Sequence, residues 1–324
     1  MATYLGTHGG RIQNYTTDPD NPNKGEVWYN GTANTIKIEA VTTAGSWATG
    51  GNLNTGRSHF QGGGGEANTA ALACGGLPAT AKTEAYNGSS WTEVNDLNTA
   101  RYGTSSGTFT SCLTTGGNGS LANTELWNGT NWTEVNDLNQ GRFQLASAGA
   151  DSTSALAFGG YTPPITFVAL SETWNGTNWS EGNDMNTARY VLAGAGIATS
   201  ALAYGGDSSP PGYTAETEAY NGTNWTEVNN LNTARFGTGS TNGSSNTSAL
   251  ASGGEVPGTG VTAVVEEWNG TNWTEVADLS VPRYAIGGAG TTSSAIAFGG
   301  DPTGTSTEEW TGAGAPQVRT ISTD

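Results

Sequence analysis

The sequence is short of basic residues, and this shortage limits what the chain can bind. Among 324 residues there are only three lysines, and the formal net charge is −17. Six of the eight arginines occupy one repeated position, so they do not form a free basic patch. The chain is therefore a poor partner for nucleic acid, anionic membranes or acidic polysaccharides, which attract clustered lysine and arginine.

Residues that carry catalysis or bind metals are also scarce. The chain has two histidines, His8 and His59, and two cysteines, Cys74 and Cys112. No P-loop, zinc-binding or nucleophile-elbow pattern occurs, and an isolated His59 is more typical of an ordinary loop than of a catalyst. The sequence predicts a protein that is not an enzyme, with no cofactor and no metal. The two cysteines are expected to be free thiols.

Long apolar runs and helical patterns are missing as well. No stretch approaches the length that crosses a bilayer, and the first residues (MATYL) do not resemble a secretory signal. Sustained helical spacing of apolar residues is absent, whereas glycine is abundant, with 50 residues. These absences favour an all-β protein.

The chain does contain one motif that is repeated six times. Each copy has a tryptophan, an arginine about ten residues later, a Gly-Gly pair and then Glu-x-Tyr or Glu-x-Trp. Successive tryptophans lie 41 to 48 residues apart, which is the period of four-stranded propeller blades. The tryptophans are Trp47, Trp91, Trp132, Trp179, Trp225 and Trp273. The aromatic residues that end the Glu-x-Tyr/Trp motif are Tyr86, Trp127, Trp174, Tyr220, Trp268 and Trp310.

The copy that begins at Arg142 predicts four strands. A Gly/Ala-rich stretch is followed by strands at 154–158, 171–174 and 178–182, with a tight Asn-Gly turn at 175–178. Small and large residues alternate along the second strand, which suits sheets that stack face to face around an axis. Because one blade cannot bury both of its faces, we expect the six copies to close into one ring.

The spacing of these marks resembles the kelch repeat over roughly residues 45–312. A diglycine ends the second strand, and a Tyr or Trp is followed by a Trp five residues later. The resemblance implies a six-bladed kelch-like β-propeller. Trp310 has no tryptophan after it, and Trp47 has no Glu-x-Tyr/Trp before it. We therefore expect residues 46–49 to supply the fourth strand of the sixth blade, so that N- and C-terminal strands close the ring without an open edge.

Residues 1–44 do not follow the repeat. Residues 26–30 (EVWYN) and 35–38 predict a small β-hairpin with an exposed aromatic pair, Trp28 and Tyr29. This leader, followed by GGNLNTGR at 50–57, resembles tail-fibre-like virion proteins of tailed bacteriophages, particularly marine ones. The resemblance implies that residues 1–44 dock the chain to a particle through Trp28 and Tyr29. Residues 313–324 are expected to form a C-terminal tail.

The repeated arginines and glutamates admit two interpretations. Six arginines around one mouth could form an anion-binding ring. Alternatively, each arginine pairs with a glutamate of its own or a neighbouring blade, and the equal numbers favour this structural role. The arginines are Arg57, Arg101, Arg142, Arg189, Arg235 and Arg283. The glutamates are Glu84, Glu125, Glu172, Glu218, Glu266 and Glu308.

The copies differ most between the Gly-Gly pair and the next glutamate. This segment has seven residues in blades one, two and six, but eleven in blades three, four and five. The longer segments, at 161–171, 207–217 and 255–265, are expected to emerge on one face and to form an interaction surface. The alternative is neutral variation in loop length. The candidate binding residues are Tyr161, Pro163, Pro164, Phe167, Pro210, Pro211, Tyr213, Val256 and Pro257.

The resemblance to tail-fibre-like proteins, together with these features, implies a non-catalytic phage virion protein of the tail-fibre or appendage type. It would be made in the host cytoplasm and located in the virion, as a homo-oligomer or in several copies. Its expected partners are other virion proteins and host-surface glycans, since amides pair with sugar hydroxyls and aromatic rings stack on sugar rings. The alternative is an intracellular kelch adaptor that recruits a protein partner.

Overall fold

The computed structural model describes residues 12–19, 26–41, 44–60, 63–164, 166–209, 212–241, 245–313 and 316–321. Within these residues all regular structure is β-strand, and no helix is present that could cross a membrane. The chain divides into two compact units. The larger unit spans Ser46–Thr311, and the smaller one joins the residues up to Gly45 with those from Gly312 onward.

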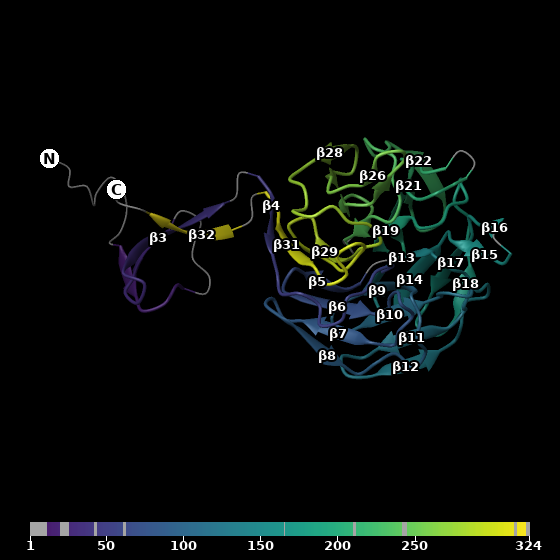
Figure 1. Cartoon of the computed structure of the whole chain (residues 1–324), viewed down its shortest axis with the longest axis horizontal. Coiled ribbons are helices and arrows are strands. Elements are labelled where there is room, and N and C mark those ends of the chain that lie inside the picture. The colour runs from purple at the N-terminus through teal and green to yellow at the C-terminus, as the bar shows by residue number, and fades with distance from the viewer. Residues whose placement is uncertain are drawn as a thin grey trace. The chain divides into compact units, whose positions relative to one another are not determined.

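The larger unit is a six-bladed β-propeller (Figure 1). Each blade is a four-stranded antiparallel sheet. Blade 1 contains β5 (Gly64–Ala67), β6 (Ala70–Cys74), β7 (Thr83–Tyr86) and β8 (Trp91–Val94). Blade 2 contains β9 (Thr104–Gly107), β10 (Cys112–Thr115), β11 (Thr124–Trp127) and β12 (Trp132–Val135). Blade 3 contains β13 (Ala146–Asp151), β14 (Ser154–Phe158), β17 (Ser171–Trp174) and β18 (Trp179–Glu181).

The other three blades have the same strand order. Blade 4 contains β19 (Ala193–Ile197), β20 (Ser200–Tyr204), β21 (Thr217–Tyr220) and β22 (Trp225–Val228). Blade 5 contains β23 (Gly239–Ser240), β24 (Ala249–Ser252), β27 (Val265–Trp268) and β28 (Trp273–Glu275). Blade 6 contains β29 (Gly287–Thr291), β30 (Ser294–Phe298), β31 (Thr307–Thr311) and β4 (Ser46–Thr49). The first strands of neighbouring blades contact one another all the way around the axis.

Blade 6 closes the ring as the repeat predicts. Its fourth strand, β4, comes from the N-terminal part of the chain and pairs antiparallel with β31 (Figure 1). Trp47 lies opposite Trp310 in this pairing, and their ring centroids are 5.3 Å apart. The same Trp/Tyr–Trp pair joins the third and fourth strands of every other blade. Closure therefore reuses the internal contact of an ordinary blade and removes the free sheet edge.

The hydrophobic core consists of six clusters, one at each interface between neighbouring blades. At the interface of blades 3 and 4, Leu156 and Phe158 pack against Ala201 and Ala203. The large face of one second strand thus meets the small face of the next, as the alternation predicts. No blade has a core of its own, so the six blades stabilise one another.

The turn between the third and fourth strands of blade 3 is a four-residue loop closed by Trp174 and Trp179. The Asn175 side chain accepts hydrogen bonds from the main-chain N–H groups of Thr177 and Asn178, each at 2.9 Å. Gly176 has a φ of 88°, so it takes the left-handed conformation that the turn requires. The fourth strand, Trp179–Glu181, is shorter than the predicted 178–182, and Asn178 belongs to the turn.

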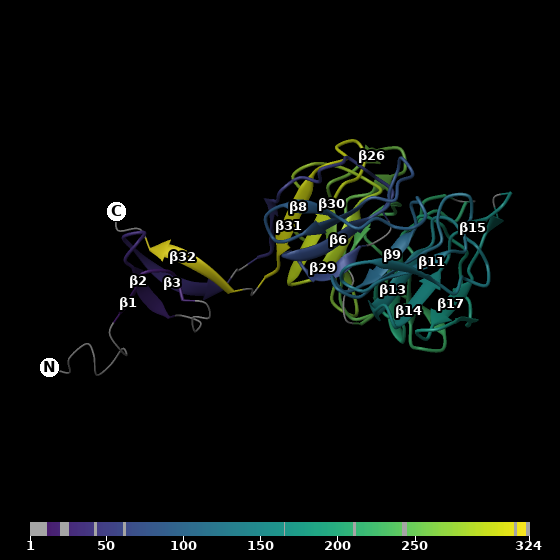
Figure 2. The ribbon, with the colours of Figure 1, turned by 90° about the horizontal axis from the view of Figure 1, so that it is seen from below.

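The smaller unit is a four-stranded sheet in the order β1-β2-β3-β32 (Figure 2). Its strands are β1 (Gln13–Tyr15), β2 (Val27–Asn30), β3 (Thr35–Val41) and β32 (Pro316–Ile321). β2 and β3 form the predicted hairpin, and β1 lies parallel to β2. The expectation of a separate tail at 313–324 is wrong, because β32 pairs with β3 from Ile36–Ile321 to Val41–Pro316. A hairpin leaves an open edge, and the C-terminal strand occupies that edge.

The expectation of an exposed aromatic pair in this unit is also wrong. Trp28 has no exposed surface, and its indole N–H donates to Asp18 at 3.0 Å. The Asn30 amide donates to the same carboxylate at 2.7 Å. Tyr29 is only half-buried. Neighbouring residues of a strand point to opposite faces, so Trp28 and Tyr29 cannot form one surface, and Trp28 has a structural role.

Candidate interaction face

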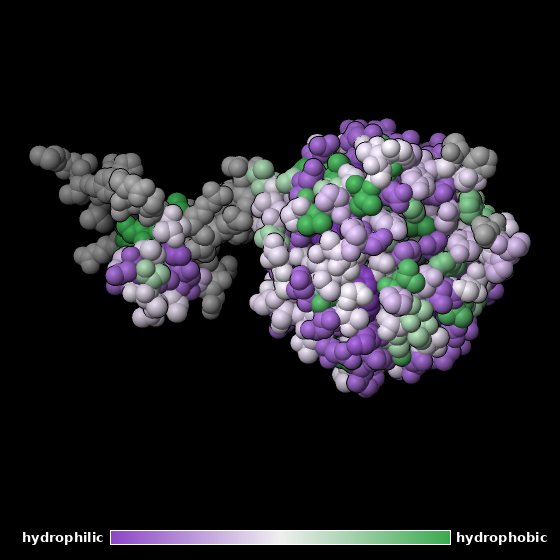
Figure 3. All heavy atoms as spheres, viewed as in Figure 1, coloured by the Kyte–Doolittle hydropathy of each residue, from purple (hydrophilic) through white to green (hydrophobic). Residues whose placement is uncertain are grey.

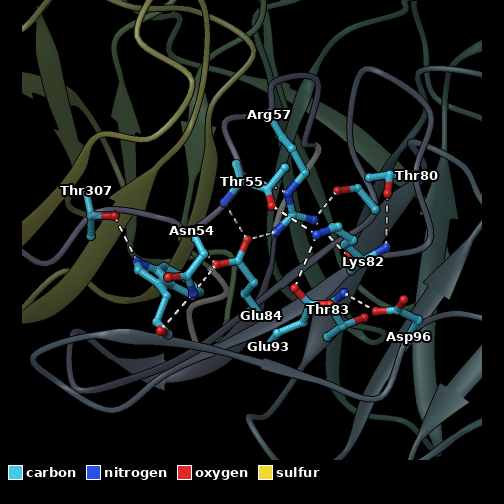
Figure 4. Close-up of polar contacts among 12 residues, drawn as sticks. Asn54, Thr55, Arg57, Thr80, Lys82, Thr83, Glu84, Glu93, Asp96 and Thr307 are labelled. Atoms are coloured by element: carbon cyan, nitrogen blue, oxygen red, sulfur yellow. Dashed lines mark hydrogen bonds and ion pairs between the residues drawn. The ribbon is translucent and has the colours of Figure 1, made fainter.

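Every repeated arginine forms a buried ion pair with the glutamate of its own blade. In blade 1, Arg57 Nη2 lies 2.8 Å from Glu84 Oε1 (Figure 4). The other Glu84 oxygen accepts hydrogen bonds from the main-chain and side-chain N–H groups of Asn54, at 2.7 and 2.9 Å. Arg57 also donates to the carbonyl oxygens of Gly75 and Lys82. The pair thus ties the loop that enters the blade to its second and third strands.

The other five blades repeat this pair at 2.9–3.1 Å. These pairs are Arg101–Glu125, Arg142–Glu172, Arg189–Glu218, Arg235–Glu266 and Arg283–Glu308. Burial lowers the pKa of each guanidinium, and the facing glutamate opposes this shift. None of these six arginine side chains has exposed surface, and the six glutamates are at most 4 % exposed. The arginines therefore do not form an anion-binding ring.

The repeated tryptophans are also part of the scaffold. In five blades the indole N–H donates to a hydroxyl of the preceding blade at 2.9–3.1 Å. Trp132, for example, donates to Thr83 at 3.0 Å, and both side chains are buried. Trp47 in the closing blade differs, because Val265 stands where the hydroxyl would be and the indole donates to the Ala277 carbonyl. The closing interface therefore lacks one interblade hydrogen bond of the usual type.

Two positions of the repeat that the scaffold does not use lie on one face of the propeller. We call this set the collar: the residue after each repeated arginine and the residue after each Gly-Gly pair. Its first group is Ser58, Tyr102, Phe143, Tyr190, Phe236 and Tyr284. Its second group is Leu77, Asn118, Tyr161, Asp207, Glu255 and Asp301. Together they place two variable side chains on each blade.

The two groups are locked together by main-chain hydrogen bonds. In five blades the two collar residues form an isolated antiparallel bridge, such as Tyr284 with Asp301. In blade 2, the Tyr102 N–H donates instead to the Asn118 side chain at 3.2 Å. Residues opposite each other in an antiparallel pair project to the same side. The two variable side chains of a bridged blade therefore lie next to each other.

A second set of main-chain hydrogen bonds joins neighbouring blades beneath the collar. The N–H of His59 donates to the carbonyl of Ala285, and Ala285 in turn donates to Gly237, at 2.8 and 2.7 Å. The series continues from Gly237 to Val191 and from Val191 to Gln144. All five residues have a φ between 50° and 67°. The collar thus stands on a hydrogen-bonded base, and its side chains are held in place before any partner binds.

Aromatic rings form half of the collar. Tyr102 lies between His59 and Phe143, with ring centroids 5.8 and 5.0 Å apart. Tyr161 lies between Phe143 and Tyr190, at 5.1 and 5.6 Å. Most of these contacts are edge-to-face, an arrangement that aromatic rings favour. The isolated His59 of the sequence is therefore a half-buried member of this array, and burial lowers its pKa.

The long loops of blades 3 to 5 extend the collar. The blade 3 loop forms a small hairpin, β15 (Tyr161–Thr162) with β16 (Thr166–Phe167). Phe167 stacks on Tyr190 at 4.4 Å and 22°. In the blade 4 loop, Tyr213 packs on Phe236 at 4.3 Å. These loop aromatics are not fully exposed, because all of them are half-buried against collar rings.

The remaining candidate residues lie at loop tips. Blade 5 has a second small hairpin, β25 (Glu255–Val256) with β26 (Gly260–Val261). Val256 is half-buried within it, and Pro257 is exposed at its turn. Pro163 and Pro164 are exposed at the turn of the blade 3 hairpin. Pro210 and Pro211 lie outside the described residues.

Sequence reasoning missed most of the collar. Tyr102, Phe143, Tyr190, Phe236 and Tyr284 each follow a repeated arginine directly, so their shared position was visible in the alignment of the copies. These residues belong to segments of constant length, so the differences in loop length did not point to them. Asp207, Glu255 and Asp301 were also missed, although each follows a Gly-Gly pair and the first two begin long loops.

These three acids divide the collar into two halves. Asp207, Glu255 and Asp301 belong to the consecutive blades 4, 5 and 6, whereas blades 1 to 3 carry neutral residues at that position. The Tyr190 hydroxyl donates to Asp207 at 3.2 Å. Burial and then this carboxylate raise the pKa of Tyr190 to about 12. Burial and nearby carboxylates also raise the pKa values of Tyr213 and Tyr284. We call this half, with its tyrosines and Phe236, the acidic half-collar.

Other reactive groups do not add to this face. Cys74 and Cys112 are free thiols, as expected, and both are buried at the interface of blades 1 and 2. Among the residues that the structure describes, no group of three or more His, Cys, Asp or Glu side chains could hold a metal ion.

Comparison with known proteins identifies the fold. The structure matches that of YjhT, a kelch-like β-propeller, with a TM-score of 0.64 at 12 % sequence identity. The match covers 84 % of this chain and 100 % of YjhT. No protein-family model matches the sequence, and no curated protein is significantly similar to it. At this identity the likeness shows the β-propeller fold alone.

Proposed function

We propose that this chain is a non-catalytic virion component of a tailed bacteriophage that binds a partner through its collar. The smaller unit would attach the chain to the particle, and the propeller would present the collar outward. The phage assignment rests on the resemblance of residues 1–57 to tail-fibre-like proteins. The division of the chain into two compact units supports separate attachment and binding roles.

One observation carries the binding role. The six arginines, six glutamates and five of the six tryptophans of the repeat are buried, whereas the variable side chains converge on one face. Half-exposed aromatic side chains on a rigid main-chain base are typical of interaction surfaces. In Figure 3, apolar residues are scattered among hydrophilic ones on the propeller face in view.

Because Trp28 is buried, we place the surface that attaches to the particle elsewhere on the small unit. Trp28 holds the small sheet together through Asp18, so it does not contact the particle directly. Tyr15 and Ile12 are the large apolar side chains of the described small unit that are exposed, at 36 % and 54 %. We propose that this edge of the small sheet, near β1, makes the contact.

The test is a loop exchange in the intact phage. Residues 161–171 of blade 3 are replaced with LPATAKT, the seven-residue segment that blade 1 uses between its Gly-Gly pair and Glu84. The exchange removes Tyr161 and Phe167 from the collar while keeping a connection that the fold already accepts. We expect particles to assemble normally and to adsorb to host cells at least about tenfold less well, since aromatic anchors dominate binding.

A matched control lengthens the outer turn at Asn221–Asn224 by four glycine and serine residues, away from the collar. Unchanged adsorption of the loop-exchange phage would contradict the proposal. Absence of the chain from purified particles would instead favour the intracellular adaptor.

A further inference from the structure

We infer that the acidic half-collar binds a polypeptide segment rich in lysine or arginine. This inference rests on the proposed function, because it names the partner chemistry of the same face. Blades 4, 5 and 6 each present a carboxylate at the same repeat position, beside an aromatic ring that the main chain holds in register. The neutral half-collar, on blades 1 to 3, provides an internal comparison.

The three carboxylates have phenol neighbours but no cationic partner. Asp207 accepts a hydrogen bond from the Tyr190 hydroxyl, and the carboxylates of Glu255 and Asp301 help to raise the pKa values of Tyr213 and Tyr284. None of the three takes part in an ion pair among the described residues. Their negative charge is therefore unbalanced locally, unlike that of the six scaffold glutamates.

The rest of the propeller offers no positive charge to compensate for them. The repeated arginines lie buried in their own pairs, and Lys82 contacts Glu93 in blade 1. With a net charge of −17, the chain attracts cations and repels anionic partners. Charge thus selects a positively charged partner for this face.

The aromatic rings favour ammonium and guanidinium groups in particular. A cation over the face of a tyrosine or phenylalanine ring is attracted by the electrons of the ring, and a nearby carboxylate adds direct charge pairing. Tyr190, Phe236 and Tyr284 supply one ring per acidic blade. A single small cation would occupy one of these sites. An extended segment with repeated basic side chains would occupy all three, and linked contacts strengthen one another.

A hollow beside this half can hold a further part of the segment. It has a volume of about 180 Å³ and lies between blades 6 and 1, where Ser58 takes the place of an aromatic residue. Leu77, Asp301 and Pro302 line it, and Leu77 is 37 % exposed. The exposed Leu77 side chain and the Asp301 carboxylate suit a lysine side chain, which has an apolar stem and a charged end.

The test compares fluorescein-labelled hexalysine with its fully Nε-acetylated form by fluorescence anisotropy on the full chain. The main variant is E255Q/D301N, which alters the two more exposed acids, and D207N is added in a second variant. The control is E227Q/E275Q, which removes the same charge from exposed glutamates of the fourth strands of blades 4 and 5. Urea unfolding checks that each variant folds.

We expect hexalysine to bind the wild-type chain and the acetylated peptide not to bind. E255Q/D301N should weaken hexalysine binding by about tenfold or more, and the control by less than about threefold. Equal loss in both variants would overturn the inference, because attraction would then depend only on net charge. Equal binding of the acetylated peptide would overturn it as well.

The same data separate this inference from the proposed function. If the loop-exchange phage adsorbs poorly but hexalysine does not bind the collar, the collar binds a partner of different chemistry and only this inference is overturned. If hexalysine binds the collar but the loop exchange leaves adsorption intact, the inference holds and the role in attachment falls.

Discussion

The interior of the propeller and its collar are built from the same six copies, yet they vary in opposite ways. Arginine and glutamate occur in all six interiors, in pairs that differ by only 0.3 Å between the shortest and longest contacts. The twelve collar positions hold seven different residue types. The interior is buried between blades, so a change there disturbs two sheets, whereas a collar side chain lies on main chain that is already hydrogen-bonded. The comparison teaches that repeat positions buried between blades stay constant and form the scaffold, whereas repeat positions on the exposed face vary and form the interaction surface.

The largest expected effect comes from breaking an interior pair. Arg142→Met leaves Glu172 buried without its cation, and we expect a loss of about 3–5 kcal/mol in the free energy of unfolding. Urea denaturation measures it. Lys82→Met is the control, because the Lys82–Glu93 pair is exposed and its loss should cost less than about 1 kcal/mol. Similar losses in the two variants would erase the contrast between buried and exposed charges.

A smaller effect is expected at the interblade tryptophans. Trp132→Phe removes the hydrogen bond to the buried Thr83 hydroxyl and should lower the free energy of unfolding by about 1–3 kcal/mol. Trp47→Phe should cost less, because its indole donates to a carbonyl in an exposed setting. Comparing the urea-unfolding midpoints of the two variants tests whether the closing blade contacts its neighbour more weakly than other blades do. Equal losses in the free energy of unfolding would show that the closing blade is held as tightly as the others.

Collar aromatics should matter less to stability than to binding. Tyr213→Ala removes the contact with Phe236, and we expect a loss below about 1.5 kcal/mol, since the ring is half-buried. Adsorption of the corresponding phage should fall more than that of a Tyr15→Ala phage that still assembles. A stability loss as large as that of Arg142→Met would show that Tyr213 belongs to the scaffold and not only to the loop that extends the collar.

The smallest expected effect is a pH dependence from His59. Burial lowers its pKa in the folded protein below the usual value of about 6.5, and Asp301 only partly opposes this shift. As the pH falls through 6.5, the unfolded chain binds a proton that the folded chain does not yet bind, so stability decreases. The decrease ends below the folded pKa. His59→Gln should lose this component, which urea unfolding between pH 5 and 7.5 would reveal as the difference from the wild type.

Much of the fold could be predicted from the sequence because the propeller repeats each constraint six times. The Trp and Glu-x-Trp marks located β4 beside β31, since Trp310 and Trp47 each lacked the partner that every other copy has. The alternation of small and large residues in β14 predicted how blades 3 and 4 stack. The Arg–Glu pairs followed from matching numbers of opposite charges in the same register.

The small unit shows where such reasoning fails. Nothing repeats there, so no second copy could reveal that Pro316–Ile321 pairs with β3 or that Asp18 holds Trp28. These contacts join segments far apart in the chain, and the sequence of a single strand does not identify the strand with which it pairs. Residues 26–30 looked like an exposed hairpin because the strands on either side of it were unknown.

By itself, the sequence determined the all-β architecture, the number of blades, the ring closure and the structural role of the arginines, because each is specified by a local pattern that occurs six times. Only the tertiary structure decided which side chains meet on the collar. Bridges between the loop after each arginine and the residue after each Gly-Gly pair bring together Tyr190 and Asp207, or Tyr284 and Asp301, from 17 residues apart. The repeat shows that these two positions recur, but the contact between them depends on how the loops fold over the blades, which the sequence pattern does not specify.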